Sequence, residues 1–155
     1  MDQYKIISDE GDALDLIRPL WEKLNLMHQS MSPHFTERFR NMRWEDRRSK
    51  IAAKASSVLL EYAVERATGN IVGYCISTID KENQAVGEID SLFIEDNHRN
   101  SGIGSALIER ATEWLTSRGT TTQKLLVGVG NENAIEFYKK FGFYPLHIVL
   151  QKIDK

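Results

Sequence analysis

The sequence predicts a single α/β domain built on a mixed β-sheet. Its 155 residues are the length of one ordinary domain. Its residues are 41% hydrophobic and 27% charged, as in soluble globular proteins. The pattern of apolar residues gives a strand, two helical segments, three strands in succession, and then helix, strand, helix, strand. Because antiparallel strands here pass into a strand–helix–strand crossover, we expect a central mixed sheet of about six to seven strands flanked by about four to five helices.

The N-terminal third contributes one strand and mostly helix. Residues 4–7 have the composition of a short strand. Pro19 falls inside the helical pattern that follows, where it either kinks the helix or marks a new first turn. Ser32 followed by Pro33 predicts the start of another helix, and a further short helix is expected over residues 45–55. The apolar positions that predict the first helix are Ala13, Leu16, Ile17, Leu20, Trp21, Leu24 and Met27.

The remaining elements alternate between strand-like and helical patterns. Gly119 suits the left-handed cap of one helix, and Asn131 is a favourable N-cap for the next. A hairpin turn is expected at residues 67–70, between the first two strands of the antiparallel run. The predicted strands are residues 58–66, 71–80, 85–95, 124–129 (of a buried type) and 145–152, and the predicted helices are 103–118 and 131–141.

Composition and charge exclude several classes of protein. The formal charge of −2 argues against a dedicated nucleic-acid binder and gives no reason to expect a membrane surface as partner. The single cysteine, Cys75, excludes an internal disulfide, and its apolar neighbours favour a small buried residue over a nucleophile. The N-terminus lacks the pattern of a signal peptide, and no apolar run is long enough to span a membrane. We therefore expect a cytoplasmic protein.

The most informative segment is a glycine turn between a strand and a helix. Residues 88–94 form the strand, and Gly102 and Gly104 lie where the following helix begins. Such a turn lets backbone N–H groups converge, and the helix N-terminus adds free donors and partial positive charge, so the segment suits a phosphate or pyrophosphate. The alternative is a pair of glycines that only permit a tight turn. The segment does not match a dinucleotide-binding fingerprint, because the position of the third glycine is Leu107. It does not match a Walker loop either, because it lacks the lysine.

Two motifs together resemble the GNAT superfamily of acetyl-CoA-dependent N-acetyltransferases. The first is Arg99-x-x-Gly102-x-Gly104 after a strand, and the second is Asn131-x-x-Ala134-x-x-Phe137-Tyr138-x-x-x-Gly142-Phe143 after the next strand. The resemblance runs from about residue 58 to 151, which would be the acetyl-CoA-binding core. It implies that residues 1–55 supply helices on the acceptor side of one N-acetyltransferase domain spanning 1–155.

The resemblance also implies where acetyl-CoA would bind. The pantetheine arm would run along the strand at Leu92, Phe93 and Ile94 and contact Asn131. The backbone from residue 99 to 105 would hold the pyrophosphate. That pyrophosphate segment consists of Arg99, Asn100, Ser101, Gly102, Ile103, Gly104 and Ser105.

The implied chemistry is direct attack of an amine on the acetyl thioester through a tetrahedral intermediate. By analogy with the family, the Leu92 backbone N–H would stabilise the oxyanion and the Tyr138 hydroxyl would protonate the departing thiolate. Glu88 resembles the base of histone-type relatives, acting directly or through water. Asp90 would share the face of Glu88 on a regular strand, so the pair could instead shift each other's pKa or bind a cationic substrate.

Several alternatives remain open on the sequence alone. The same fold could serve as a non-catalytic acyl-CoA-binding regulatory module, and an NAD or nucleotide enzyme is a weaker third interpretation. The acceptor could be a small-molecule amine, a polyamine, an antibiotic, or a peptide or protein amine. The four histidines are interpreted as ordinary surface or core residues, and no cluster has metal-ligand spacing, so no metal is expected. Residues 146–150 suit the edge strand of a monomer or the interface of a homodimer.

Overall fold

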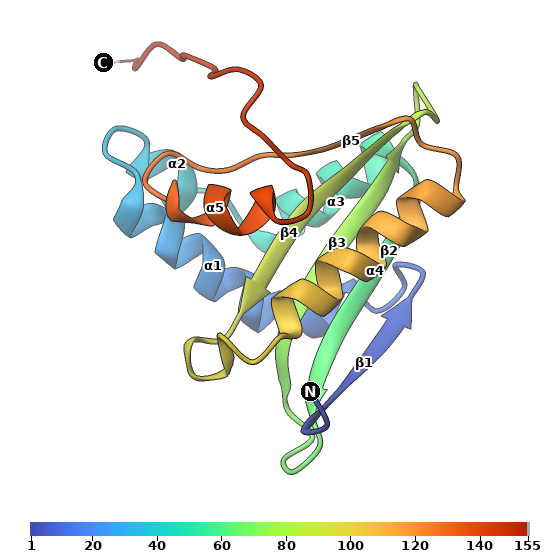
Figure 1. Ribbon diagram of the computed structural model, residues 1–155. Helices are drawn as coiled ribbons and strands as arrows, with labels where there is room; N and C mark the ends of the chain where they lie inside the picture. Colours follow the sequence, from blue (N-terminus) through green and yellow to red (C-terminus); the bar gives the residue numbers. More distant parts are fainter. Residues whose placement is uncertain (155) are drawn as a thin grey trace.

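The computed structural model describes residues 1–154 and contains the predicted mixed sheet (Figure 1). Its five strands lie in the order β1-β2-β3-β4-β5. The first four pair antiparallel, and β5 pairs parallel to β4. The α/β class is confirmed, whereas the number of strands is lower than the predicted six to seven. The strands are β1 (Tyr4–Asp9), β2 (Ala55–Glu65), β3 (Ile71–Asp80), β4 (Val86–Ile94) and β5 (Thr122–Leu125).

Helices cover both faces of this sheet (Figure 1). One face packs against the side chains of α1 and α3 through a core that includes Trp21, Trp44 and Tyr74. The other face packs against α4 and α5 through a core that includes Leu107, Ile108 and Phe137. The helices are α1 (Arg18–Met31), α2 (Thr36–Arg40), α3 (Trp44–Lys54), α4 (Ile103–Ser117) and α5 (Asn133–Lys139), with short 3₁₀ turns at Leu14–Ile17 and Asp96–His98.

Pro19 marks a new first turn, which decides between the two interpretations of that residue. The 3₁₀ turn ends at Ile17, and α1 starts at Arg18 with the proline in its first turn. The missing N–H of proline costs nothing there, because the first amides of a helix have no internal partner. The next predicted start is wrong, because Ser32 ends α1 and α2 begins only at Thr36. The Ser32 hydroxyl accepts a hydrogen bond from the Phe35 amide (3.0 Å) in the connecting turn.

The middle of the chain agrees closely with its prediction. Strand β3 has the predicted bounds, while β2, β4 and α4 differ from theirs by at most a few residues. Gly119 has a φ of +86° after α4, as expected for a left-handed cap. Cys75 is buried, and burial raises the pKa of its thiol to about 12, so it is not a nucleophile at neutral pH.

The C-terminal strands are the part of the prediction that is wrong. Strand β5 has four residues, none of them fully buried, instead of the buried strand predicted over 124–129. Residues 145–152 form no strand, and the chain leads away from the sheet after α5 (Figure 1). Within residues 1–154, β5 pairs with β4 alone, and no strand lies on its outer edge. The apolar residues 146 and 148–150 are each more than four-fifths exposed, and their contact with a second copy stays a prediction.

No helix among residues 1–154 is both long enough and apolar enough to cross a membrane.

Candidate active site

A β-bulge at Asp90 opens the sheet between β4 and β5. Ser91 pairs with Ile76 and Ile89 pairs with Ser77, so Asp90 is the extra residue on β4. The parallel pairing with β5 ends at Ile89, although β4 continues to Ile94. The second half of β4 therefore presents backbone groups that β5 does not cover.

A cavity of about 70 Å³ lies at this opening. It contains three of the predicted site residues, Leu92, Asn131 and Tyr138. A larger groove of about 580 Å³ between α1 and the α2–α3 segment contains none of them. The small cavity is therefore the candidate active site. Its other lining residues are Leu24, His28, Ile89, Asp90, Ser91, Leu125, Leu126, Val127 and Gly128.

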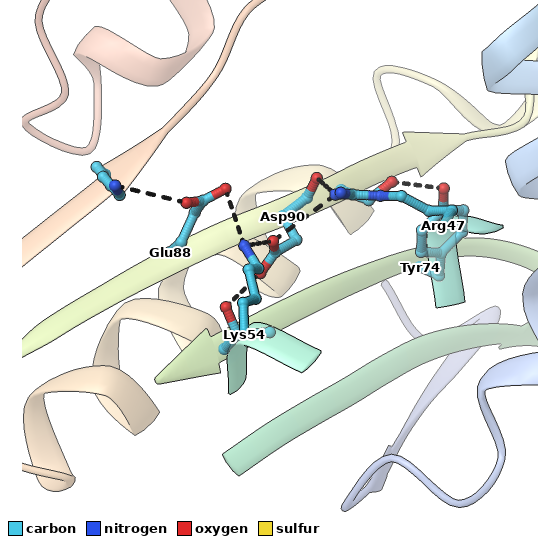
Figure 2. A network of polar contacts seen from close by, with 8 residues as sticks. Arg47, Lys54, Tyr74, Glu88 and Asp90 are labelled. Atoms are coloured by element: carbon cyan, nitrogen blue, oxygen red, sulfur yellow. Dashed lines mark hydrogen bonds and ion pairs between the residues drawn. The ribbon is translucent and has the colours of Figure 1, made fainter. Parts of the chain in front are cut away.

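A polar network holds the bulge from the side of α3 (Figure 2). The Asp90 side chain has no exposed surface, and its carboxylate pairs with the Lys54 ammonium and accepts a hydrogen bond from the Thr78 hydroxyl (2.5 Å). The Arg47 guanidinium donates to the Asp90 carbonyl oxygen (2.9 Å). The hydroxyl of Ser91, which follows Asp90 on β4, is hydrogen-bonded to the Tyr74 hydroxyl of β3 (2.7 Å). The extra residue is thus fixed through both its backbone and its side chain.

The predicted base, Glu88, belongs to this network and does not line the cavity. Its carboxylate lies 3.3 Å from the Lys54 nitrogen and 3.8 Å from the Lys124 nitrogen. Lys54 therefore lies between Glu88 and Asp90, which do share one face as expected (Figure 2). Both carboxylates already have cationic partners from the chain itself.

Tyr138 places its phenol in the cavity from α5. Its ring packs edge-on against Phe137 and Phe143, with centroids 5.3 and 6.4 Å away. Burial raises the pKa of Tyr138, so the hydroxyl stays protonated across the neutral range and can donate a hydrogen bond.

Asn131 lines the cavity but does not cap α5. The helix begins at Asn133, and the Glu132 side chain at the cap position accepts a hydrogen bond from the Gly130 amide (2.9 Å) and does not cap the helix. The Asn131 backbone N–H donates to the Gly128 carbonyl oxygen in the preceding turn (3.0 Å). This turn brings Asn131 to the cavity wall that Tyr138 also lines, and the predicted cap is wrong.

The glycine turn leads into the N-terminus of α4. Asn100 and Gly102 both have positive φ values, of 60° and 89°. Within residues 1–154, no hydrogen bond is recorded from the backbone amides of Ile103, Gly104 and Ser105, as expected for the first turn of a helix. Gly104 also permits close packing, because a Cβ there would lie 3.3 Å from the Phe137 ring.

Arg99 is held back against its own loop. Its guanidinium donates to the Ile94 carbonyl oxygen (3.0 Å) and pairs with Asp96 (3.0 Å), over the Phe93 ring. The Arg99 side chain is half-exposed, so an anion bound at the turn could replace Asp96 as its ionic partner. Leu92, on the open edge of β4, lines the cavity, and the chain runs from there through the glycine turn to the free amides of α4.

Comparison with known proteins identifies this arrangement. The model of the Acetyltransferase (GNAT) family matches residues 20–143, which is most of the chain. The chain belongs to the GNAT family. Among curated relatives of this GNAT protein, an uncharacterised N-acetyltransferase of Methanocaldococcus jannaschii is 45% identical over 74 residues, which are 48% of this chain and 32% of that protein. The matched parts amount to about a quarter to a half of the length of the curated relatives.

Solved structures share the fold of this GNAT protein over nearly its whole length. An aminoglycoside acetyltransferase from an uncultured soil metagenomic sample, in complex with sisomicin, has a TM-score of 0.66 at 17% identity and covers 99% of this chain and 97% of its own. The aminoglycoside acetyltransferase AAC(6')-Iy, in complex with the bisubstrate analogue CoA-S-monomethyl-acetylneamine, has a TM-score of 0.65 at 17% identity and covers 98% of both chains. At these identities the likeness establishes the fold.

One ionisable residue at the cavity of the GNAT protein was interpreted from the sequence as an ordinary histidine. His28 lies on α1, one helical turn after Leu24, and both line the cavity. The spacing of four residues placed them on one face of the helix, which was the available signal. No group of three or more His, Cys, Asp or Glu residues in the described part of the chain could hold a metal ion.

Proposed function

We propose that this GNAT protein transfers an acetyl group from acetyl-CoA to a primary amine by direct attack on the thioester. The observation that carries the proposal is the continuity of one backbone path: the uncovered edge of β4 lines the cavity together with Tyr138, and the chain continues from that edge through the glycine turn to the free amides of α4. The pyrophosphate fits the helix N-terminus because the unpaired amides and the helix dipole both favour anions there.

The site residues have two kinds of role in the proposed reaction, binding of acetyl-CoA and chemistry. The backbone of Leu92, Phe93 and Ile94 would pair with the pantetheine arm, and residues 99–105 would bind the pyrophosphate. Asn131 would contact the arm from the cavity wall. The Leu92 N–H would stabilise the oxyanion, and the Tyr138 hydroxyl would donate to the sulfur as the C–S bond breaks. Two aminoglycoside acetyltransferases of this fold support an amine as acceptor.

The first test compares ligands by their effect on thermal unfolding. A ligand at a hundred times its Kd stabilises a protein by about 2.7 kcal/mol, which corresponds to a rise in Tm of about 5–10 °C for a chain of this size. We expect that rise with acetyl-CoA and with CoA, but not with NADH or ATP at equal concentration. Release of CoA is then followed with sisomicin, spermidine and a lysine-containing peptide. Stabilisation by NADH or ATP alone would contradict the proposal.

Substituting alanine for Gly102 is expected to weaken CoA binding. The left-handed φ of +89° costs a residue with a Cβ about 1–2 kcal/mol, and relief of this strain would turn the amides of α4 away from the pyrophosphate. We expect the Kd for CoA, measured by calorimetry, to rise about tenfold, or about 1.4 kcal/mol.

Gly69 supplies the matched control for this substitution. It has a φ of +75° in the β2–β3 turn, and a Cβ there would meet nothing within 4 Å. Gly69→Ala should therefore lower the Tm by a similar amount and leave the Kd for CoA unchanged. Equal Kd values for CoA in the two variants would show that the glycine turn does not take part in CoA binding.

A further inference from the structure

The candidate base in the cavity is a histidine on α1, outside both motifs. His28 is the residue of the acceptor-side helices with an ionisable side chain at the cavity wall. A Cβ built on Gly128 would lie 3.4 Å from its Nδ1 and 3.6 Å from its Cε1, so the edge of the imidazole faces the backbone that follows β5. His28 and Tyr138 therefore border one space from different layers of the fold.

The orientation of the His28 ring is fixed by α2. The imidazole stacks on the Phe39 ring, with centroids 5.2 Å apart and an angle of 28° between the planes. The Phe39 carbonyl in turn accepts a hydrogen bond from the buried Asn25 side chain (2.8 Å), which ties α2 to α1. The ring is thus held by packing, and within residues 1–154 no hydrogen bond to either ring nitrogen is recorded. A ring nitrogen is therefore left for a substrate or a water in the cavity.

The other ionisable groups at the cavity are already committed. The Asp90 carboxylate pairs with Lys54 and accepts from Thr78, and the Arg47 guanidinium lies 3.7 Å from it. Tyr138 is a proton donor, because burial raises its pKa. Phe39 and Gly128, the contacts of His28 from α2 and from the turn after β5, carry no charge. A proton acceptor is needed because a primary amine is protonated at neutral pH and its lone pair is then unavailable.

We propose that His28 is the general base that deprotonates the acceptor amine, an assignment that rests on the proposed acetyl transfer. A ring nitrogen takes one proton from the ammonium group, directly or through one water. The freed lone pair forms the C–N bond to the thioester carbon, and the C=O electrons move to the oxygen. When the intermediate collapses, the C–S bond breaks. The nitrogen gives its second proton to the Tyr138 oxygen, directly or through water, as the Tyr138 hydroxyl gives its own proton to the sulfur, and the imidazolium returns its proton to solvent.

The size and the ionisation of the site agree with this role. A volume of about 70 Å³ corresponds to roughly two water molecules, which is room for the amine head and the acetyl carbon and not for a whole acceptor. Burial lowers the pKa of His28 from its ordinary value of 6.5. The imidazole is therefore neutral, and able to accept a proton, at pH 7.

The decisive experiment is the pH profile of kcat/KM for His28→Gln. CoA release is measured from pH 5 to 9 with the best acceptor among sisomicin, spermidine and a lysine-containing peptide. For the wild type we expect the rate to fall below a midpoint under pH 6.5, where His28 becomes protonated. His28→Gln should lose about 100-fold in kcat/KM at pH 7 and should lose this midpoint, so that its rate rises steadily with pH. Acetyl-CoA should raise the Tm of both proteins equally.

Two further variants and one direct titration complete the test. His147→Gln, at an exposed position in the C-terminal segment, is the matched control and should behave as wild type. Glu88→Gln should keep the low-pH midpoint, whereas loss of the midpoint in this variant would return the base to Glu88. The pKa of the His28 imidazole, measured by NMR on the wild type, should equal the kinetic midpoint. This comparison does not depend on how any variant folds.

The outcomes separate this proposal from the proposed function. A wild type that turns over an amine, together with a His28→Gln variant within threefold of it or with an unchanged midpoint, would overturn the role of His28 alone. An NMR pKa more than one unit from the kinetic midpoint would do the same. A wild type that binds no acetyl-CoA, or that binds it and acetylates no amine in the panel, would overturn the proposed function and the role of His28 with it.

Discussion

Asp90→Ala is expected to lower the free energy of unfolding by about 2–3 kcal/mol. The Asp90 side chain is fully buried, and it holds Lys54 and Thr78 while Arg47 binds its carbonyl oxygen. Removing one member of a buried charge pair costs about 3–5 kcal/mol when the other charge stays buried. Lys54 keeps 36% and Arg47 23% of its side chain exposed, so water offsets part of that cost.

The expected change can be measured by thermal unfolding. For this chain length, 2–3 kcal/mol corresponds to a fall in Tm of about 4–12 °C. Asp90→Asn keeps an acceptor for the Thr78 hydroxyl and should lose less than the alanine variant. Glu22→Ala removes a carboxylate from an exposed ion pair with Arg18 (3.5 Å) and should change the stability by less than about 0.5 kcal/mol. Equal losses for Asp90→Ala and Glu22→Ala would show that the network does not hold the bulge.

The same bulge shows what local sequence patterns can and cannot predict. Ile89, Leu92 and Ile94 all pack into the core beside α4, although a regular strand would place residue 89 on the opposite face from the other two. This break in the period of two follows from the extra residue at Asp90, which sequence analysis did not predict. The partners that fix it were not visible, because Arg47 and Lys54 lie on α3 and meet Asp90 only in the folded chain.

Elements that show a clear periodic pattern of apolar residues in the sequence were predicted well. The antiparallel strands and α4 bury regular apolar faces, so periodicity alone located them within a few residues. The glycine turn was recognised for the same reason, since positive φ at Gly102 is a local requirement. Residues 145–152 were predicted as a strand on composition, yet a strand also needs a pairing partner, and these residues pair with no strand of the sheet. His28 was passed over because its contacts with Phe39 and Gly128 belong to other segments.

Tyr138→Phe is expected to lower kcat about 100-fold while leaving the Kd for acetyl-CoA unchanged. The substitution removes one hydroxyl and keeps the ring that packs against Phe137 and Phe143. On the proposed function, that hydroxyl donates to the sulfur only as the thiolate leaves, so its loss raises the barrier without weakening the bound thioester. A positioned acid contributes about 10²–10⁴-fold to a rate, and the raised pKa of Tyr138 places its contribution at the lower end, because a weaker acid gives up its proton less readily.

The measurement pairs calorimetric binding of acetyl-CoA with single-turnover formation of the acetylated amine. Tyr144→Phe removes the same hydroxyl from a ring that is 71% exposed and is expected to match the wild type in both. A thioester whose leaving thiolate is more stable needs less assistance from an acid. An acyl donor with a lower thiol pKa should therefore reduce the gap between the transfer rates of wild type and Tyr138→Phe. If the gap stays constant across such donors, Tyr138 shapes the cavity and does not assist the departure of the sulfur.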